Sequence, residues 1–182
     1  MDEFYVSNSN SRVKSPAKQD FYIVNDIFTN QVRKKMIKDV NPLLLTSEQM
    51  KRVANCPDKW HPGRQTVNTL YNQPTFKPQI EFLINVAQEV TQLKFGLHGA
   101  WVNWTNGKKK DINWHIHPCD YTLCYYMKIF PFFSNGTLYE NGFIKAKQNS
   151  FLLSRGYLKH TAPTSPLRFG RYTLVLDLGV LK

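Results

Sequence analysis

The sequence predicts a single α+β domain that is mostly β, with its helices packed on one sheet. Its 182 residues are enough for one domain with a substantial core. Helical patterns fill the first half, and after Gly96 the chain changes to short runs of β-forming residues separated by turns. Helices followed by strands are typical of α+β domains, and many short strands with regular turns favour a sandwich or barrel.

The N-terminal part of the chain divides into an arm and the start of the domain. Residues 1–19 are polar and predict a loose arm, so that the domain covers residues 20–182. Residues 21–24 predict a short strand. A helix is expected over residues 31–40, with Thr29 or Asn30 as its N-cap.

Two more helices are expected before residue 96. The first covers residues 47–55, with Ser47 as its cap, and the segment 56–75 is expected to be mostly loop because it is rich in Pro and Gly. The second starts near Pro78 and ends at Gly96. Its apolar stripe has helical spacing and consists of Ile80, Leu83, Ile84, Ala87, Val90 and Leu93.

The rest of the chain reads as strands. Turn pairs such as Asn106-Gly107 and Asn141-Gly142 separate them. The expected strands cover residues 97–104, 121–130, 137–139, 142–146, 150–154 and 171–180.

Composition limits the partners and the location. The formal charge is +11, from 24 Lys and Arg against 13 Asp and Glu, which makes an acidic partner such as nucleic acid an option. The basic residues are scattered, however, and the longest run is Lys108-Lys109-Lys110. No apolar run could span a membrane, and the N-terminus does not resemble a secretory signal. We therefore expect a cytoplasmic protein, in a host cell if it is viral, with no membrane partner.

Three histidines carry the chemistry. Residues i and i+2 of a strand point to the same face, so His115 and His117 would project side by side. His160, arriving on another strand, could complete a facial metal site with open positions for a substrate and dioxygen. Arg171 follows and could hold a carboxylate with two parallel hydrogen bonds.

The residues alone leave the metal open, because imidazole binds Fe, Zn, Cu and Ni alike. The odd number of cysteines, with no zinc-knuckle spacing, favours free thiols. A thiolate ligand from Cys119 or Cys124, which flank the histidines, is the alternative. We interpret His61 and His98 as ordinary histidines.

Four segments, Asn113–Pro118, Thr122–Lys128, Phe151–His160 and Arg171–Leu178, resemble the core of the Fe(II)- and 2-oxoglutarate-dependent dioxygenases. The resemblance is closest to the prolyl-hydroxylase-like branch and its small phage and bacterial relatives. It implies a double-stranded β-helix, or jelly roll. It also implies Fe(II), with 2-oxoglutarate and O2 as co-substrates, and hydroxylation or demethylation of a second substrate with release of succinate and CO2.

The resemblance also implies residue roles. His115 matches the first metal ligand, His160 the distal ligand, and Arg171 the residue that binds the far carboxylate of 2-oxoglutarate. Tyr126 matches a tyrosine that supports the same carboxylate. Strand alternation places two further residues in the same pocket, so the predicted co-substrate site consists of Arg171, Tyr126, Thr173 and Thr122.

The sequence departs from the family pattern at the middle ligand. The family usually reads His-x-Asp, and this chain reads His115-Ile116-His117. The middle ligand is either His117 or the nearest carboxylate, Asp120. Arg168 competes with Arg171 for the carboxylate, but Arg171 is preferred because it leads a strand of alternating apolar residues.

Several alternatives stay open at this stage. A cupin-type dioxygenase can use three histidines without 2-oxoglutarate, and a jelly-roll binding or virion protein would be no enzyme at all. The second substrate could be a small molecule, a peptide or protein, or nucleic acid. Trp101, Trp104 and Trp114 could line the pocket, and the segment 60–64 could cover it.

Overall fold

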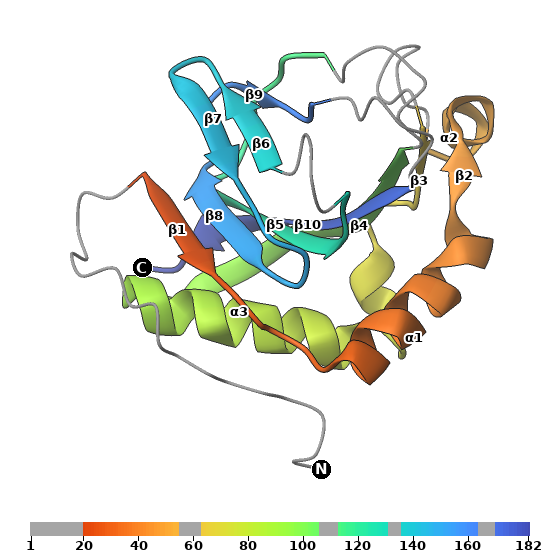
Figure 1. Cartoon of the computed structure of the whole chain (residues 1–182), viewed down its shortest axis with the longest axis horizontal. Coiled ribbons are helices and arrows are strands. Elements are labelled where there is room, and N and C mark those ends of the chain that lie inside the picture. The colour runs from red at the N-terminus through yellow and green to blue at the C-terminus, as the bar shows by residue number, and fades with distance from the viewer. Residues whose placement is uncertain (1–19, 55–62, 106–112, 131–135, 164–169) are drawn as a thin grey trace.

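The structure is a computed structural model, and it describes residues 20–54, 63–105, 113–130, 136–163 and 170–182. The elements form three layers: helices, a large sheet and a small sheet (Figure 1). In chain order they are β1 Phe21–Val24, α1 Asn30–Val40, a 3-10 turn Asn41–Leu43, β2 Leu45–Thr46, α2 Ser47–Ala54, β3 Arg64–Gln65, a second 3-10 turn Leu70–Asn72, α3 Lys77–Thr91, β4 Phe95–Thr105, β5 Tyr121–Lys128, β6 Gly136–Tyr139, β7 Gly142–Lys145, β8 Phe151–Arg155, β9 His160–Thr161 and β10 Arg171–Val180.

Helices α1 and α2 begin where side-chain capping satisfies some of their first N–H groups. The Thr29 hydroxyl accepts from the N–H of Val32 and caps α1. The prediction that Ser47 caps α2 is wrong. The hydroxyl of Thr46 accepts from the N–H of Gln49, and the side-chain oxygen of Gln49 accepts from the N–H of Thr46, which forms a capping box at the start of α2. No helix in the described ranges is long and apolar enough to cross a membrane.

Helix α3 ends earlier than predicted. Gln92 adopts a left-handed conformation at its C-terminus with φ 59°, and its N–H bonds the carbonyl of Gln88. Gly96 therefore lies in β4. The predicted apolar stripe packs as expected, with Ile80, Leu83 and Ala87 fully buried against the sheet.

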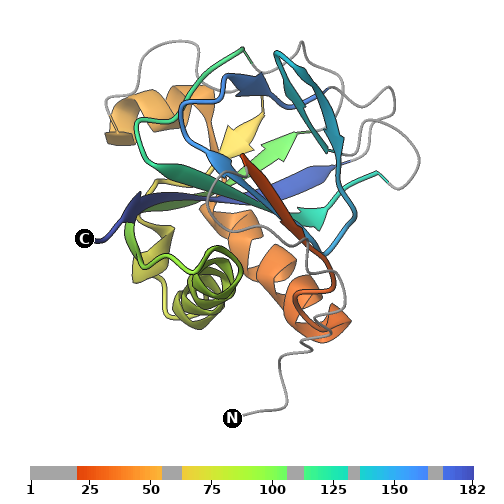
Figure 2. The ribbon, with the colours of Figure 1, turned by 90° about the vertical axis from the view of Figure 1, so that its left-hand side faces the viewer.

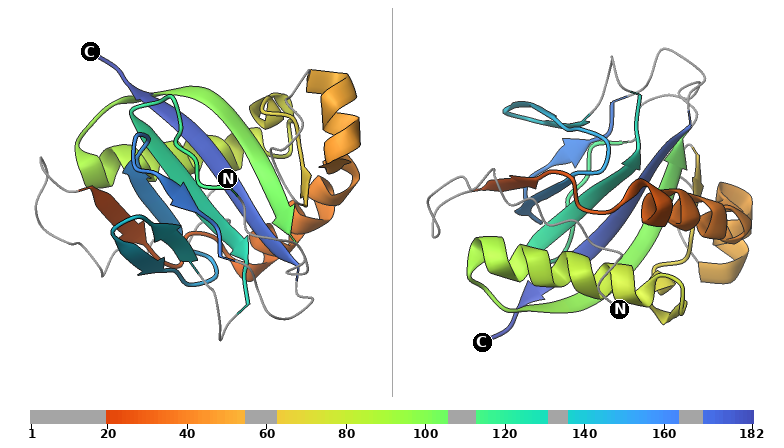
Figure 3. Two further views of the ribbon diagram at one scale, coloured as in Figure 1. Left: turned by 90° about the horizontal axis from the view of Figure 1, so that it is seen from above. Right: turned by 60° about the horizontal axis from the view of Figure 1, so that its bottom comes forward.

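The large sheet has seven strands in the order β1-β8-β5-β10-β4-β3-β2. β10 lies between β5 and β4 and pairs antiparallel with both. The small sheet has the order β7-β6-β9 and covers the face of the large sheet that α1 and α3 do not cover (Figures 2 and 3). The α+β, mostly β prediction is confirmed, although the sequence reasoning missed the short strands β2, β3 and β9.

Strand alternation gives the central strands two different faces. Leu174, Leu176 and Leu178 of β10 point to the helices and join the main core. Tyr126 and Cys124 of β5 belong instead to the smaller cluster between the two sheets. We call the side of the large sheet that faces the small sheet the inner face, and it carries the polar residues described below.

Asn149 fixes the connection between β1 and α1. Its side-chain amide donates to the carbonyl of Phe28, and its Oδ1 accepts from the N–H of Phe28 and the hydroxyl of Tyr125, at 2.7–3.1 Å. Its backbone has φ 67°, a left-handed conformation that asparagine tolerates better than most residues. One side chain therefore satisfies three polar groups.

We expect Asn149→Ala to lower the free energy of unfolding by about 2–4 kcal/mol, because it leaves three partly buried polar groups without partners. Urea denaturation of the two proteins would measure this. Asn85→Ala, at an exposed position of α3, serves as the control and should change stability by less than about 0.5 kcal/mol. Equal midpoints for Asn149→Ala and the natural protein would contradict the role given to this side chain.

Candidate metal centre

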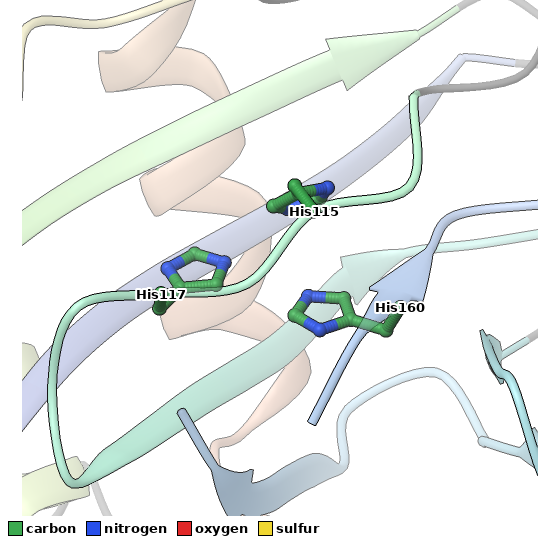
Figure 4. Close-up of side chains that lie close together, drawn as sticks. All are labelled: His115, His117 and His160. Atoms are coloured by element: carbon green, nitrogen blue, oxygen red, sulfur yellow. The ribbon is translucent and has the colours of Figure 1, made fainter. Parts of the chain in front are cut away.

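The structure brings the three predicted histidines together. One ring nitrogen from each of His115, His117 and His160 lies within 4.8 Å of the others, and the rings face one another (Figure 4). Ring centroids are 4.6–5.2 Å apart. Nitrogens that share an ion at about 2.1 Å lie at most about 4.2 Å apart, so small side-chain movements would suffice to share one.

The backbone explains why the two parts of the site meet. His115 and His160 form an antiparallel bridge, in which each N–H bonds the other's carbonyl at 2.9–3.0 Å. The N–H of His117 bonds the carbonyl of Gly156 at 2.9 Å. The expectation that the His-x-His pair lies in a strand is wrong, because only the bridge at His115 is regular. Both rings nevertheless point into the same cluster (Figure 4).

Gly156 permits this close approach. A Cβ added there would lie 2.1 Å from the carbonyl oxygen of Cys119 and 2.9 Å from that of His117. Any larger residue would push the His117 segment away from β8.

Hydrogen bonds fix the same tautomer in all three rings. The Nδ1 atoms of His115 and His160 lie 2.8 Å from the backbone carbonyls of Asn113 and Leu158. The Nδ1 of His117 lies 2.7 Å from the carboxylate of Asp177. Each acceptor requires a proton on Nδ1, so a neutral ring keeps its lone pair on Nε2. Three Nε2 lone pairs are therefore available to one cation.

Burial favours the neutral form of two of these rings. It lowers the pKa of His160 to about 4 from the ordinary 6.5 and also lowers that of His115, although hydrogen bonds to backbone carbonyls oppose the change. Neutral imidazole is the form that binds metal, so burial holds His115 and His160 in their binding form at neutral pH.

The low pKa of His160 predicts an acid-sensitive fold. Because the unfolded chain binds this proton near pH 6.5 and the folded metal-free protein only near 4, folding is favoured above pH 6.5 and loses stability as the pH falls from 6.5 toward 4. The loss is at most about 3 kcal/mol. Urea denaturation between pH 4 and 7.5 would measure it. His160→Gln should flatten this slope, and a variant with an unchanged slope would contradict the assignment.

A buried arginine lies on the same inner face. Arg171 begins β10, and its Nη2 donates to the carbonyl of Gly136 at 2.9 Å while its Nε donates to Thr173 at 3.3 Å. Its Nη1 is buried and has no hydrogen-bond partner within the described parts of the chain. In the part of the chain that the structure describes, no carboxylate forms an ion pair with Arg171. Burial lowers its pKa, which shows that the cation is poorly compensated.

Strand β6 relates this arginine to the histidines. Gly136, at its start, accepts the bond from Arg171, and Tyr139, at its end, lies 5.4 Å from the ring of His160. Three strand steps cover about 10 Å. The guanidinium and the imidazoles thus lie near opposite ends of one short strand.

The other predicted co-substrate residues lie along this face. Tyr126 pairs with Thr173 in the sheet, its hydroxyl bonds Thr137 at 2.7 Å, and its ring lies 5.4 Å from the guanidinium of Arg171. Thr122 lies at the histidine end, where its hydroxyl is 3.5 Å from Asp177.

The sequence reasoning missed two site residues of this face, Asp177 and Asn103, whereas a third, Trp101, was expected to line the pocket. Asp177 bonds His117, and Trp101 stacks on the same ring at 5.7 Å between centroids. Asn103 lies opposite Thr173, with a buried Oδ1 that has no partner. Alternation along β4 and β10 places all three on the inner face, but it gives no indication of what they contact.

The alternative ligands lie outside the cluster. The carboxylate of Asp120 accepts from the N–H of Val180 at 2.7 Å. Cys119 donates to the carbonyl of Tyr121, and burial raises its pKa to about 11 and that of Cys124 to about 12, so both thiols stay protonated. His98 is exposed. His61, Cys56 and Arg168 lie outside the described residues.

The tryptophans divide between three environments. Trp101 lines the inner face, whereas Trp104 packs with the main core and Trp114 is 43% exposed. The predicted covering segment 60–64 lies outside the described residues except for Gly63 and Arg64.

The residues present fit a divalent metal with an anionic ligand beside it. Three neutral imidazoles can hold the ion and leave positions open. The unpartnered Nη1 of Arg171 needs an acceptor, and a carboxylate is the acceptor that its fork geometry suits best.

Comparison with known proteins gives a clear result at the level of structure. No protein-family model matches the sequence, and no curated protein sequence matches it. Among solved structures, the viral collagen prolyl hydroxylase of Paramecium Bursaria Chlorella virus-1 matches with a TM-score of 0.64 at 10% identity, over 98% of this chain and 100% of that one.

Two further solved structures agree. EctD from S. alaskensis, with bound Fe, matches with a TM-score of 0.64 at 12% identity, over 88% of this chain and 72% of that one. A prolyl hydroxylase from Trichoplax adhaerens, in complex with a hypoxia-inducible-factor peptide fragment, gives 0.60 at 14%, over 88% and 83%. The double-stranded β-helix fold expected from the resemblance is therefore confirmed.

Proposed function

We propose that this protein is an Fe(II)- and 2-oxoglutarate-dependent oxygenase that hydroxylates a second substrate. In the overall reaction a C–H bond of that substrate becomes C–OH, and 2-oxoglutarate and O2 give succinate and CO2. One observation carries the proposal: a buried arginine that has no ion-pair partner among the described residues lies on the inner face, and three convergent imidazoles meet beside the same face.

The role of each residue follows from its position. His115, His117 and His160 hold the metal through Nε2, and Arg171 binds the far carboxylate of the keto acid with Thr173 and Tyr126 beside it. A bound Fe(II) ion supplies the one-electron chemistry that O2 activation requires. Arg171 and the imidazoles lie near opposite ends of β6, a strand about 10 Å long, and a short dicarboxylate could bridge them.

Asn103 extends the co-substrate site in this proposal. Among the described residues, its side-chain Oδ1 has no hydrogen-bond partner. Rotation of the side-chain amide by half a turn would place its NH2 group there instead. It can therefore donate to a carboxylate held by Arg171. Asn103 pairs with Thr173 in the sheet, and Arg171 lies two residues before Thr173 on the same face of β10.

The second substrate is proposed as a peptide side chain or a small molecule. The prolyl hydroxylase from Trichoplax adhaerens, which shares the fold, is in complex with a peptide fragment. The net charge of +11 keeps nucleic acid as a separate arm of the test, in which binding to a mixed-sequence oligonucleotide should fall steeply with salt.

The deciding experiment measures binding of 2-oxoglutarate and formation of succinate. Calorimetry without oxygen should show 2-oxoglutarate bound by the Fe(II)-loaded protein and not by the metal-free protein. After air is admitted, succinate should form only when both are present. A protein that binds Fe(II) but not 2-oxoglutarate would support the cupin-type dioxygenase with three histidines instead. A protein that takes up no Fe(II), Mn(II) or Co(II) would overturn the proposal and favour a binding or virion protein.

A further inference from the structure

The group that bonds the Nδ1 of His117 is of a different kind from those that bond the Nδ1 atoms of His115 and His160. His115 and His160 bond backbone carbonyls two residues before them in the chain, so those contacts are local and uncharged. His117 bonds a carboxylate 60 residues away, at 2.7 Å. This contact forms only when β10 and the histidine segment have come together.

Two side-chain contacts hold the ring of His117 in place. Trp101 stacks on it with an angle of 12° between the planes, and the Asp177 carboxylate bonds its Nδ1. The side chains of His117 and Asp177 are 8% and 15% exposed. A ring held by stacking on one face and by a charged bond at its edge has a single orientation, with Nε2 turned to the other two imidazoles.

The carboxylate of Asp177 interacts mainly with the ring of His117. Its other side-chain contacts are the hydroxyl of Thr122, at 3.5 Å, and the thiol of Cys119. Among the described residues, no lysine or arginine forms an ion pair with Asp177. A register shift in β10 immediately after Asp177 marks a local irregularity of the strand at this point, a feature that often redirects a side chain beside a functional site.

We propose that Asp177 is a positioning residue that supplies the negative charge of the metal centre through one hydrogen bond rather than as a ligand. Three neutral imidazoles bring no charge to a divalent ion. A carboxylate bonded to Nδ1 fixes the tautomer and makes the imidazole a stronger donor. With a divalent ion, a dianionic keto acid, Arg171 and Asp177, the charges sum to zero. The inference rests on the proposed metal site.

Two substitutions separate the charge from the hydrogen bond. Asp177→Asn keeps the shape and a carbonyl acceptor but removes the charge, whereas Asp177→Ala removes both. Loss of such a partner typically weakens metal binding by about 10–100-fold. We expect about 10-fold for Asp177→Asn and about 100-fold for Asp177→Ala, measured by titration with Co(II) without oxygen and followed by its visible absorption. Asp39→Asn, in the Lys35–Asp39 pair on α1, is the matched control and should bind Co(II) as the natural protein does.

A second measurement tests position directly and does not depend on activity. In nitrogen NMR of the metal-free protein, His117 should be the Nδ1–H tautomer in the natural sequence and should lose that preference in Asp177→Ala. If both Asp177 variants bind Co(II) as tightly as the natural protein, or if the tautomer of His117 is unchanged in Asp177→Ala, the inference is overturned while the proposed function stands. If the natural protein binds no Co(II), it is the proposed function that fails. Should Asp177→Ala not fold, Asp177→Asn alone decides, since unchanged affinity in it contradicts the charge contribution.

Discussion

Replacing His160 with alanine is expected to weaken metal binding by about 100-fold or more. His160 is the only candidate ligand that comes from a separate stretch of chain, and its Nε2 completes the set of three. Two imidazoles from one segment hold a divalent ion far less firmly than three that are held in place in advance. Titration of the metal-free protein with Fe(II) or Co(II) without oxygen would measure the loss.

His98→Ala is the matched control for this substitution. His98 is exposed and lies outside the cluster, so the same chemical change there should leave the affinity for metal within about twofold. Circular dichroism would establish that both variants are folded. If His160→Ala binds metal as tightly as His98→Ala does, the three-histidine site is not the metal centre.

Replacing Arg171 with glutamine is expected to have the second large effect, on 2-oxoglutarate. A buried charge-assisted pair contributes about 2–4 kcal/mol, so the dissociation constant of 2-oxoglutarate should rise by about 30-fold to 1000-fold. Affinity for the metal alone should change by less than about threefold, because Arg171 is not part of the cluster. Calorimetric titration of the metal-free protein with Mn(II), and of the Mn(II)-loaded protein with 2-oxoglutarate, would measure the two constants.

Arg171→Lys provides the comparison that separates charge from shape. Lysine keeps the positive charge but cannot make two parallel bonds to one carboxylate, so its effect should fall between those of arginine and glutamine. Equal affinity for 2-oxoglutarate in the natural protein and in Arg171→Gln would exclude Arg171 as the residue that binds the far carboxylate. Arg168 would then be the next candidate for that role.

Arg171→Gln should raise the stability of the metal-free protein, although it weakens the binding of 2-oxoglutarate. In the absence of a ligand, Arg171 is a buried cation whose Nη1 has no partner, and burial already lowers its pKa. Removing an uncompensated buried charge often stabilises a fold. A gain in the melting temperature of the metal-free Arg171→Gln variant, together with its loss of 2-oxoglutarate binding, would indicate that this arginine is retained for binding rather than for folding.

Much of the fold could be predicted because its determinants are local. The stripe of Ile80, Leu83 and Ala87 has the period of a helix, and the alternation in β10 separates core leucines from inner-face residues. The errors also have local causes. Thr46 and Gln49 form a better cap than Ser47 alone, and Gln92 ends α3 although it is not a glycine. Strands β2 and β9 have two residues each, too few for any period to appear.

The sequence by itself determined the chemical types and their order: paired imidazoles, a third after a β-rich interval, and an arginine at the head of a strand. Only the tertiary structure decided which atoms meet. The 2.7 Å contact between His117 and Asp177 joins two segments that are far apart in the sequence. Whether the Nη1 of Arg171 finds a partner among the described residues depends on what packs opposite it. Periodicity states which face a side chain occupies, but the pairing of strands far apart in sequence sets what lies opposite it, and that pairing depends on the packing of the whole domain.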